Sequence, residues 1–69
     1  MAFYNRGIAY YFQKDFDRAI ADYDQAIQFD ANNVHAYNNR ALAKRAKGDS
    51  TGSDTDIAKA KQLTSTDSN

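Results

Sequence analysis

Residues 4–27 read YNRGIAYYFQKDFDRAIADYDQAI, and the pattern of this stretch returns 34 residues further along the chain. Asn5-Arg6 recurs as Asn39-Arg40, and Asp15 recurs as Asp49. The other pairs at this spacing are Phe3 and Tyr37, Asp22 and Asp56, Tyr23 and Ile57, Ala26 and Ala60, Gln28 and Gln62, and Phe29 and Leu63. A sustained period of this length is typical of a repeat architecture, in which stacked units present a surface.

The composition excludes several classes of protein and site. Nine basic and nine acidic residues give a formal net charge of zero, so we expect no binding of nucleic acid or of an anionic membrane. The chain contains no Cys, which excludes disulfides and thiolate metal sites. No apolar stretch approaches the ~20 residues that cross a bilayer, and the N-terminus does not resemble a signal peptide. A cytoplasmic location is therefore the default expectation.

Apolar spacing predicts an all-α chain of about four helices. We expect the first helix over residues 2–14 and a second helix up to Asp30 that Asp17 caps. The apolar stripe of the second helix is Ala19, Ile20, Tyr23, Ala26 and Ile27. Asn33 is expected to cap a third helix over residues 34–47, which Gly48 ends because glycine tolerates the left-handed conformation.

The last third of the chain gives a weaker helical signal. Residues 49–56 are poor in helix formers, so we expect the fourth helix to begin late, with Thr51 or Ser53 as its cap. Residues 65–69 are polar and are expected to form a flexible tail. The predicted division is therefore a first repeat over residues 1–33, a degenerate second repeat over residues 34–64, and the tail.

These positions resemble the tetratricopeptide repeat. The family pattern places an aromatic residue first, Leu-Gly three and four positions later, then Tyr, then Ala with an aromatic four positions on, and finally Pro. The first repeat has Phe3, Arg6, Gly7, Tyr10, Ala19, Tyr23 and Ala31 at these places, and the second has Tyr37, Arg40, Ala41, Lys44, Ser53, Ile57 and Ser65. Gly7 and Ala41 are small where helices approach closely, and Tyr10 and Tyr23 fill the space between helices.

The resemblance implies an α-solenoid of antiparallel helix pairs whose first helices line a concave groove for a peptide or partner helix. It implies a non-catalytic protein-binding scaffold without a cofactor. The expected groove residues are Tyr4, Asn5, Ile8, Tyr11, Phe12, His35, Asn38, Asn39, Leu42 and Arg45. A subclass of the family clamps carboxylates with Lys and Asn in its first repeat, where this chain has Tyr4 and Ile8. We therefore expect an apolar ligand, with amides that bind its backbone and with Arg45 setting its charge preference.

The charged residues and the single histidine suggest no chemistry of their own. His35 lacks the N and S partners that a zinc site needs. Asp22 and Asp24 are expected on a solvated outer surface, and so are the basic residues of the third helix, for which partner binding stays open. Those basic residues are Arg40, Lys44, Arg45 and Lys47. The basic third helix is also expected to complement the acidic second helix, either within one chain or between copies.

An alternative interpretation is a self-assembling structural unit. Lys14 and Ala31 occupy the places where the family prefers the helix breakers Gly and Pro, so a straightened turn would allow helix swapping between chains. Tyr4, Tyr11 and Phe12 form an apolar patch that could join copies into a homo-oligomer. The first helix begins almost at residue 1, which suggests an excised fragment or a designed minimal unit.

Overall fold

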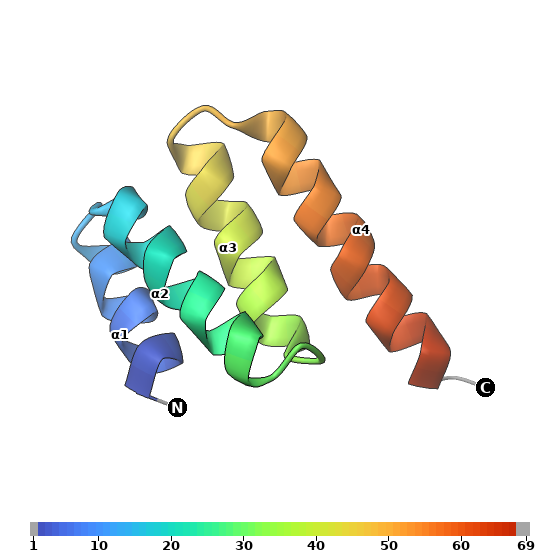
Figure 1. Cartoon of the computed structure of the whole chain (residues 1–69). Helices are drawn as coiled ribbons and strands as arrows, with labels where there is room; N and C mark the ends of the chain where they lie inside the picture. Colours follow the sequence, from blue (N-terminus) through green and yellow to red (C-terminus); the bar gives the residue numbers. More distant parts are fainter. Residues whose placement is uncertain (1, 68–69) are drawn as a thin grey trace.

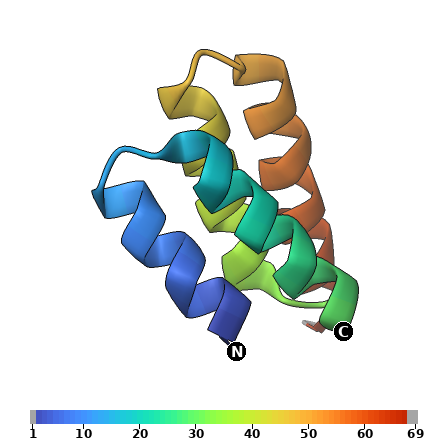
Figure 2. The same cartoon turned by 60° about the vertical axis from the view of Figure 1, so that its left-hand side comes forward.

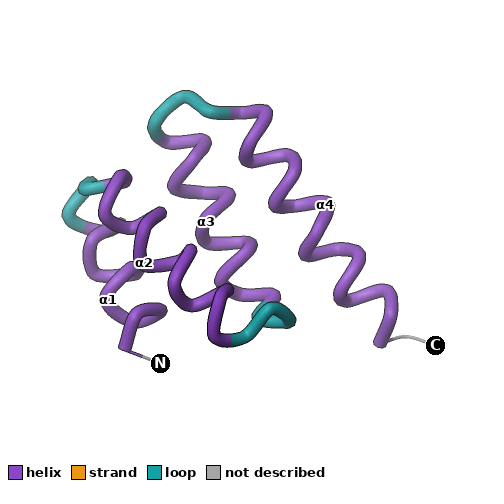
Figure 3. The backbone as a smooth tube through the Cα atoms, viewed as in Figure 1, coloured by secondary structure: helices purple, strands orange, loops and turns teal. Residues whose placement is uncertain are grey.

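The computed structural model describes residues 2–67, which form four helices joined by short turns (Figures 1 and 3). The helices are α1 (Ala2–Phe12), α2 (Phe16–Phe29), α3 (Val34–Ala46) and α4 (Ser50–Asp67). They run antiparallel in chain order, and no strand occurs among the described residues. The prediction of an all-α fold of helix-turn-helix repeats is confirmed.

Each helix packs against its neighbours in the chain. α2 contacts α1 and α3, α3 contacts α2 and α4, and α1 also touches α3. The result is a flat body of 38 × 26 × 16 Å, with α1 at one edge of the row and α4 at the other (Figure 1). α1 and α3, the first helices of the two repeats, therefore have different surroundings.

The turns inside the two repeats have the same geometry. In the first turn the N–H of Asp15 donates to the carbonyl of Tyr10 at 2.9 Å, and in the second the N–H of Asp49 donates to the carbonyl of Lys44 at 2.8 Å. This six-residue closure needs a residue with positive φ at the helix end. Lys14 adopts φ 64° and Gly48 adopts φ 98° at the two equivalent positions. The turn at Lys14 is therefore formed, although glycine is absent there.

Two equivalent aspartates begin the second helix of each repeat. Asp15 accepts a hydrogen bond from the N–H of Arg18 at 3.3 Å, and Asp49 accepts one from the N–H of Gly52 at 2.9 Å. The prediction that Asp17 caps the second helix is wrong, because Asp17 lies in the first turn of α2.

The fourth helix is longer than predicted at both ends. It begins at Ser50 rather than after a cap at Thr51 or Ser53. The Asp49 carboxylate satisfies a free N–H of the first turn and offsets the poor helix propensity of the residues that follow. The helix continues to Asp67, so residues 65–67 are helical where a tail was predicted. Ser68 and Asn69 lie outside the described residues.

The turn between the repeats also forms without its usual proline. The N–H of Asn33 donates to the carbonyl of Asp30 at 3.1 Å, and the Asp30 side chain accepts from the N–H of Asn32 at 3.1 Å. Asn33 caps α3 by accepting from the N–H of Ala36 at 3.0 Å, as predicted. Asn and Asp side chains thus supply the turn that Pro would otherwise favour.

The core follows the predicted pairing of large and small residues. Its centre is Tyr23, which lies between the buried alanines Ala19 and Ala43. A Cβ atom placed on Gly7 would lie 2.7 Å from the Tyr23 ring, so only glycine allows α1 to approach α2 this closely. Tyr23 of α2 thus lies against α1 at Gly7 and packs with Ala43 of α3.

Candidate functional site

A hollow of about 160 Å³ lies between α1 and α3, with α2 as its floor. Its walls are Ile8, Tyr11, Phe12, Tyr23, Asn39 and Leu42. Five of these are apolar or aromatic, and none carries a charge. Phe12 is 77% exposed and Leu42 is 50% exposed, so both present apolar surface to solvent beside the hollow. The hollow is smaller than the ~300–1,000 Å³ typical of sites for drug-sized ligands.

One hydrogen bond crosses between the two helices beside the hollow. The Asn39 side-chain amide donates to the Tyr4 hydroxyl oxygen at 2.9 Å. The Tyr4 O–H can still donate, and the Asn39 carbonyl oxygen can still accept, because neither has another partner among residues 2–67. The site therefore offers one donor and one acceptor next to its apolar walls.

Tyr23 forms the base of the hollow and is almost fully buried. Burial raises the pKa of Tyr23 to about 12, with the neighbouring Tyr4, Tyr11 and Asp22 adding to the increase. The Tyr4 ring lies 6.1 Å from the Tyr23 ring in a tilted arrangement. The hydroxyl at the base of the site therefore stays neutral near pH 7.

The structure brings together half of the predicted groove residues. Ile8, Tyr11, Phe12, Asn39 and Leu42 all line the hollow, and Tyr4 contacts Asn39 beside it. The other predicted residues are exposed and lie outside the lining, and these are Asn5, His35, Asn38 and Arg45. Arg45 faces Asp54 of α4 at 3.7 Å.

Tyr23 was predicted only as a core residue, yet it lines the hollow as well. Its large ring at a position facing two first helices is the signal that could have indicated this. Because Tyr23 lies between the two helices that line the hollow, its ring contributes both to the core and to the wall of the hollow.

The ion pairs repeat with the sequence period. Arg6 donates to both carboxylate oxygens of Asp22, each at 2.8 Å, and Arg40 donates to both oxygens of Asp56 at 2.8 and 2.6 Å. Each arginine also lies over the aromatic ring three residues before it, at 5.5 Å for Arg6 and 5.4 Å for Arg40. Such bidentate pairs fix the relative orientation of the two side chains as well as neutralising their charges.

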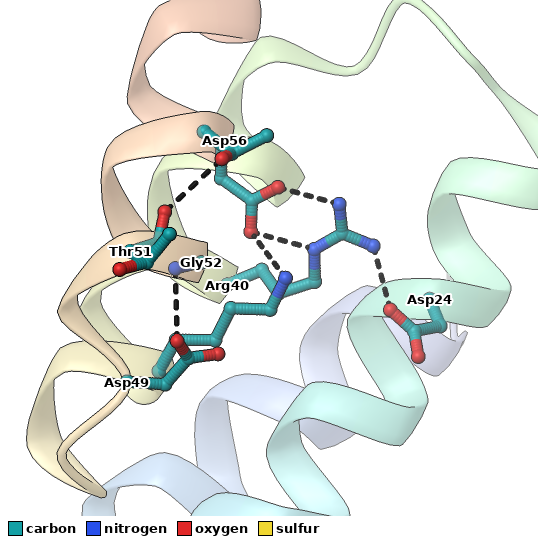
Figure 4. Close-up of polar contacts among 8 residues, drawn as sticks. Asp24, Arg40, Asp49, Thr51, Gly52 and Asp56 are labelled. Carbon is teal, nitrogen blue, oxygen red and sulfur yellow. Dashed lines mark hydrogen bonds and ion pairs between the residues drawn. The ribbon is translucent and has the colours of Figure 1, made fainter.

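Arg40 makes a further bond that joins three helices. Its Nη1 donates to Asp24 of α2 at 2.6 Å while its other nitrogens hold Asp56 of α4 (Figure 4). Lys44 adds a contact to Asp56 at 3.1 Å. Burial alone would raise the pKa of Asp56, but hydrogen bonds from Arg40 and Lys44 hold that pKa below its ordinary value of 3.8. The same bonds raise the pKa of Arg40.

The prediction of a solvated charged surface is therefore wrong for several residues. Asp22 is buried against Arg6, and the Arg40 side chain is only 17% exposed. The acidic second helix and the basic third helix do complement each other within one chain, through Asp24 with Arg40 and Asp17 with Lys47.

The described residues give no support to a metal site. No group of three His, Cys, Asp or Glu side chains among residues 2–67 could hold a metal ion. His35 is exposed at the start of α3. Within the same range, no helix is both long enough and apolar enough to cross a membrane.

Comparison with known proteins agrees with the repeat geometry. Residues 1–33 match the tetratricopeptide repeat family. Stress-induced-phosphoprotein 1 of Caenorhabditis elegans is 51% identical over 35 residues, which cover 51% of this chain and 11% of that protein. The chain thus spans about a tenth of the length of this relative. Repeats of this kind are non-catalytic and generally mediate protein–protein interaction. The first repeat, residues 1–33, is therefore assigned to the tetratricopeptide repeat family.

Proposed function

We propose that this chain is a non-catalytic module that binds a peptide or a partner helix in the hollow between α1 and α3. The observation that carries the proposal is the uncharged hollow itself, with Phe12 and Leu42 exposed beside it. A hollow of about 160 Å³ suits one bulky apolar side chain rather than a cofactor.

The polar groups beside the hollow support an extended peptide as the ligand. The free Tyr4 O–H and the free Asn39 carbonyl oxygen match one backbone C=O and one backbone N–H of a peptide. No charged side chain lines the hollow, so a terminal carboxylate has no counter-charge there. The preferred ligand is therefore a segment with an apolar anchor inside the peptide.

The test is a selection of peptides from a random displayed library, followed by fluorescence anisotropy with the selected peptides. We expect selected peptides to share a bulky apolar residue. Phe12→Ala should weaken their binding at least about tenfold, since exposed aromatic anchors dominate such contacts. Phe29→Ala is the matched control, because Phe29 is 76% exposed but does not line the hollow. Equal binding by both variants would refute the proposal.

Self-assembly is the second candidate function, and the exposed Phe12, Phe29 and Leu42 favour it. Both turns that swapping would straighten are closed by hydrogen bonds, so association would proceed through surfaces rather than exchanged helices. Sedimentation across a range of concentrations separates the candidates. A monomer that titrates with peptide supports the first, and a concentration-dependent mass that Phe12→Ala lowers supports the second.

A further inference from the structure

The Tyr23 hydroxyl is a buried polar group that the core does not satisfy. Tyr23 lies on α2, the helix between α1 and α3 (Figure 2), and it is only 1% exposed. Within residues 2–67, no group forms a hydrogen bond with its hydroxyl. Because an unpaired buried hydroxyl destabilises a fold, core packing accounts for the Tyr23 ring but not for the oxygen at its tip.

The tip of the Tyr23 ring points to the hollow. The side of the ring is held against α1, where a Cβ atom on Gly7 would lie 2.7 Å from Tyr23 Cε1 and 3.2 Å from Cζ. Among the described residues, Ser53 Oγ is the side-chain atom that is both unpaired and fully enclosed. The Tyr23 hydroxyl is unpaired without being enclosed, and the hollow that Tyr23 lines supplies the remaining space.

A neutral group is needed to satisfy this hydroxyl. Burial raises the pKa of Tyr23 to about 12, so the hydroxyl stays protonated and can both donate and accept. The described residues that line the hollow carry no charge, so a charged tip on a ligand would find no counter-charge there. The complementary ligand atom is therefore an uncharged donor or acceptor at the end of an apolar group.

The volume and the walls of the hollow define that apolar group. The hollow holds about 160 Å³. An apolar cavity of ~150 Å³ admits one benzene ring, which leaves little room for the two rings of an indole. Tyr11 and Phe12 line the hollow with rings that meet edge to face at 5.8 Å, and aromatic walls of this kind favour a further ring. One six-membered ring with a neutral polar tip is a phenol.

We propose that the hollow takes a tyrosine side chain of the bound segment, and that the phenol hydroxyl of this ligand residue forms a hydrogen bond with the Tyr23 hydroxyl. The inference rests on the proposed peptide binding and adds the identity of the anchor. Tyr4 and Asn39 stay available for the backbone of the same ligand residue. A phenylalanine anchor would fill the same space but leave the Tyr23 hydroxyl unpaired, so it binds more weakly.

The test compares two small probes that differ only in the phenol hydroxyl. N-acetyl-tyrosinamide and N-acetyl-phenylalaninamide are both uncharged, and each carries backbone N–H and C=O groups. Each probe is titrated into the labelled protein while NMR follows the methyl groups of Ile8 and Leu42, which line the hollow. We expect the wild type to bind the tyrosine probe about tenfold more tightly than the phenylalanine probe.

Tyrosine-to-phenylalanine variants identify the hydroxyl that makes the distinction. Tyr23→Phe keeps the ring in the core, which circular dichroism checks, and should bring the ratio of the two affinities to about one. Tyr10→Phe is the matched control, because Tyr10 does not line the hollow, and it should keep the tenfold preference. A preference that Tyr11→Phe removes and Tyr23→Phe retains would overturn the proposal.

Failure of this inference can be told apart from failure of the proposed function. Equal binding of both probes to the wild type, with shifts at Ile8 and Leu42, would overturn the tyrosine anchor and leave the apolar binding site standing. If neither probe shifts these methyl groups, both the anchor and the proposed function are refuted.

Discussion

Ser53 is the second repeat's counterpart of Ala19, and both side chains are buried. The Ser53 hydroxyl has no hydrogen-bond partner within the described part of the chain. A buried polar group without a partner costs about 1–3 kcal/mol. Ser53→Ala should therefore raise the free energy of unfolding by about 1 kcal/mol, measured by urea denaturation followed by circular dichroism.

The same change at an exposed serine is the control for this prediction. Ser50→Ala alters the first turn of the same helix at an exposed position. It should give no comparable gain, because no buried hydroxyl is removed. If both variants change stability equally, the cause is helix propensity rather than the buried hydroxyl of Ser53.

The ion pairs of Asp56 make the free energy of unfolding depend on pH in the acidic range. Its pKa is lower in the folded protein than its ordinary value of 3.8, because the bonds from Arg40 and Lys44 outweigh burial. Its contribution to stability is therefore complete above about pH 4 and is lost as pH falls through the folded-state pKa. We expect the free energy of unfolding to decline below pH 4, while carbon NMR shows Asp56 still ionised in the folded protein.

An aspartate on the same helix provides the comparison for the acid prediction. Asp54→Asn changes an exposed carboxylate that lies 3.7 Å from Arg45. It should retain the wild-type decline below pH 4, whereas Asp56→Asn should lower stability at pH 7 by about 3 kcal/mol and flatten the decline. Protonation of Asp56 above its ordinary pKa would contradict this account.

At the scale of elements, the turn between α1 and α2 keeps its shape at a conformational cost. Lys14 adopts φ 64°, a conformation that costs a residue with a side chain about 1–2 kcal/mol. Lys14→Gly should therefore raise the free energy of unfolding by about 1 kcal/mol in chemical denaturation. Gln13→Gly, one residue earlier in the same turn, should lower it instead, since Gln13 has no positive φ to relieve. A loss of stability in Lys14→Gly would show that the lysine side chain contributes more than its backbone strain.

The position of α4 shows where element prediction from sequence failed. Propensity alone places its start too late, because Gly52 and its neighbours are poor helix formers. The useful signal was the recurrence of Asp15 as Asp49, since both carboxylates cap the helix that follows them.

At the scale of the whole molecule, the 34-residue period predicted the helix order, and the family resemblance predicted most of the hollow's lining. Periodicity places Ile8 and Leu42 on equivalent sides of α1 and α3, and these sides do meet. The burial of Asp22 and Asp56 against arginines was not predicted, because charged residues are seldom buried unless they have partners. Arg6 with Asp22 and Arg40 with Asp56 share one separation of 16 residues, and this coincidence was the available signal.

Arg40 links the unfolding of the two repeats. It holds Asp24 in the first repeat and Asp56 in the second, so unfolding either repeat alone breaks the contact between Arg40 and Asp24. The buried cluster of Ala19, Tyr23 and Ala43 also spans the two repeats, and a core this small rarely supplies more than about 3–5 kcal/mol. The repeats should therefore not melt in sequence, as units of a longer array can. Backbone amides of α2, α3 and α4 should exchange with deuterium at one common free energy, so that the two repeats behave as a single cooperative unit.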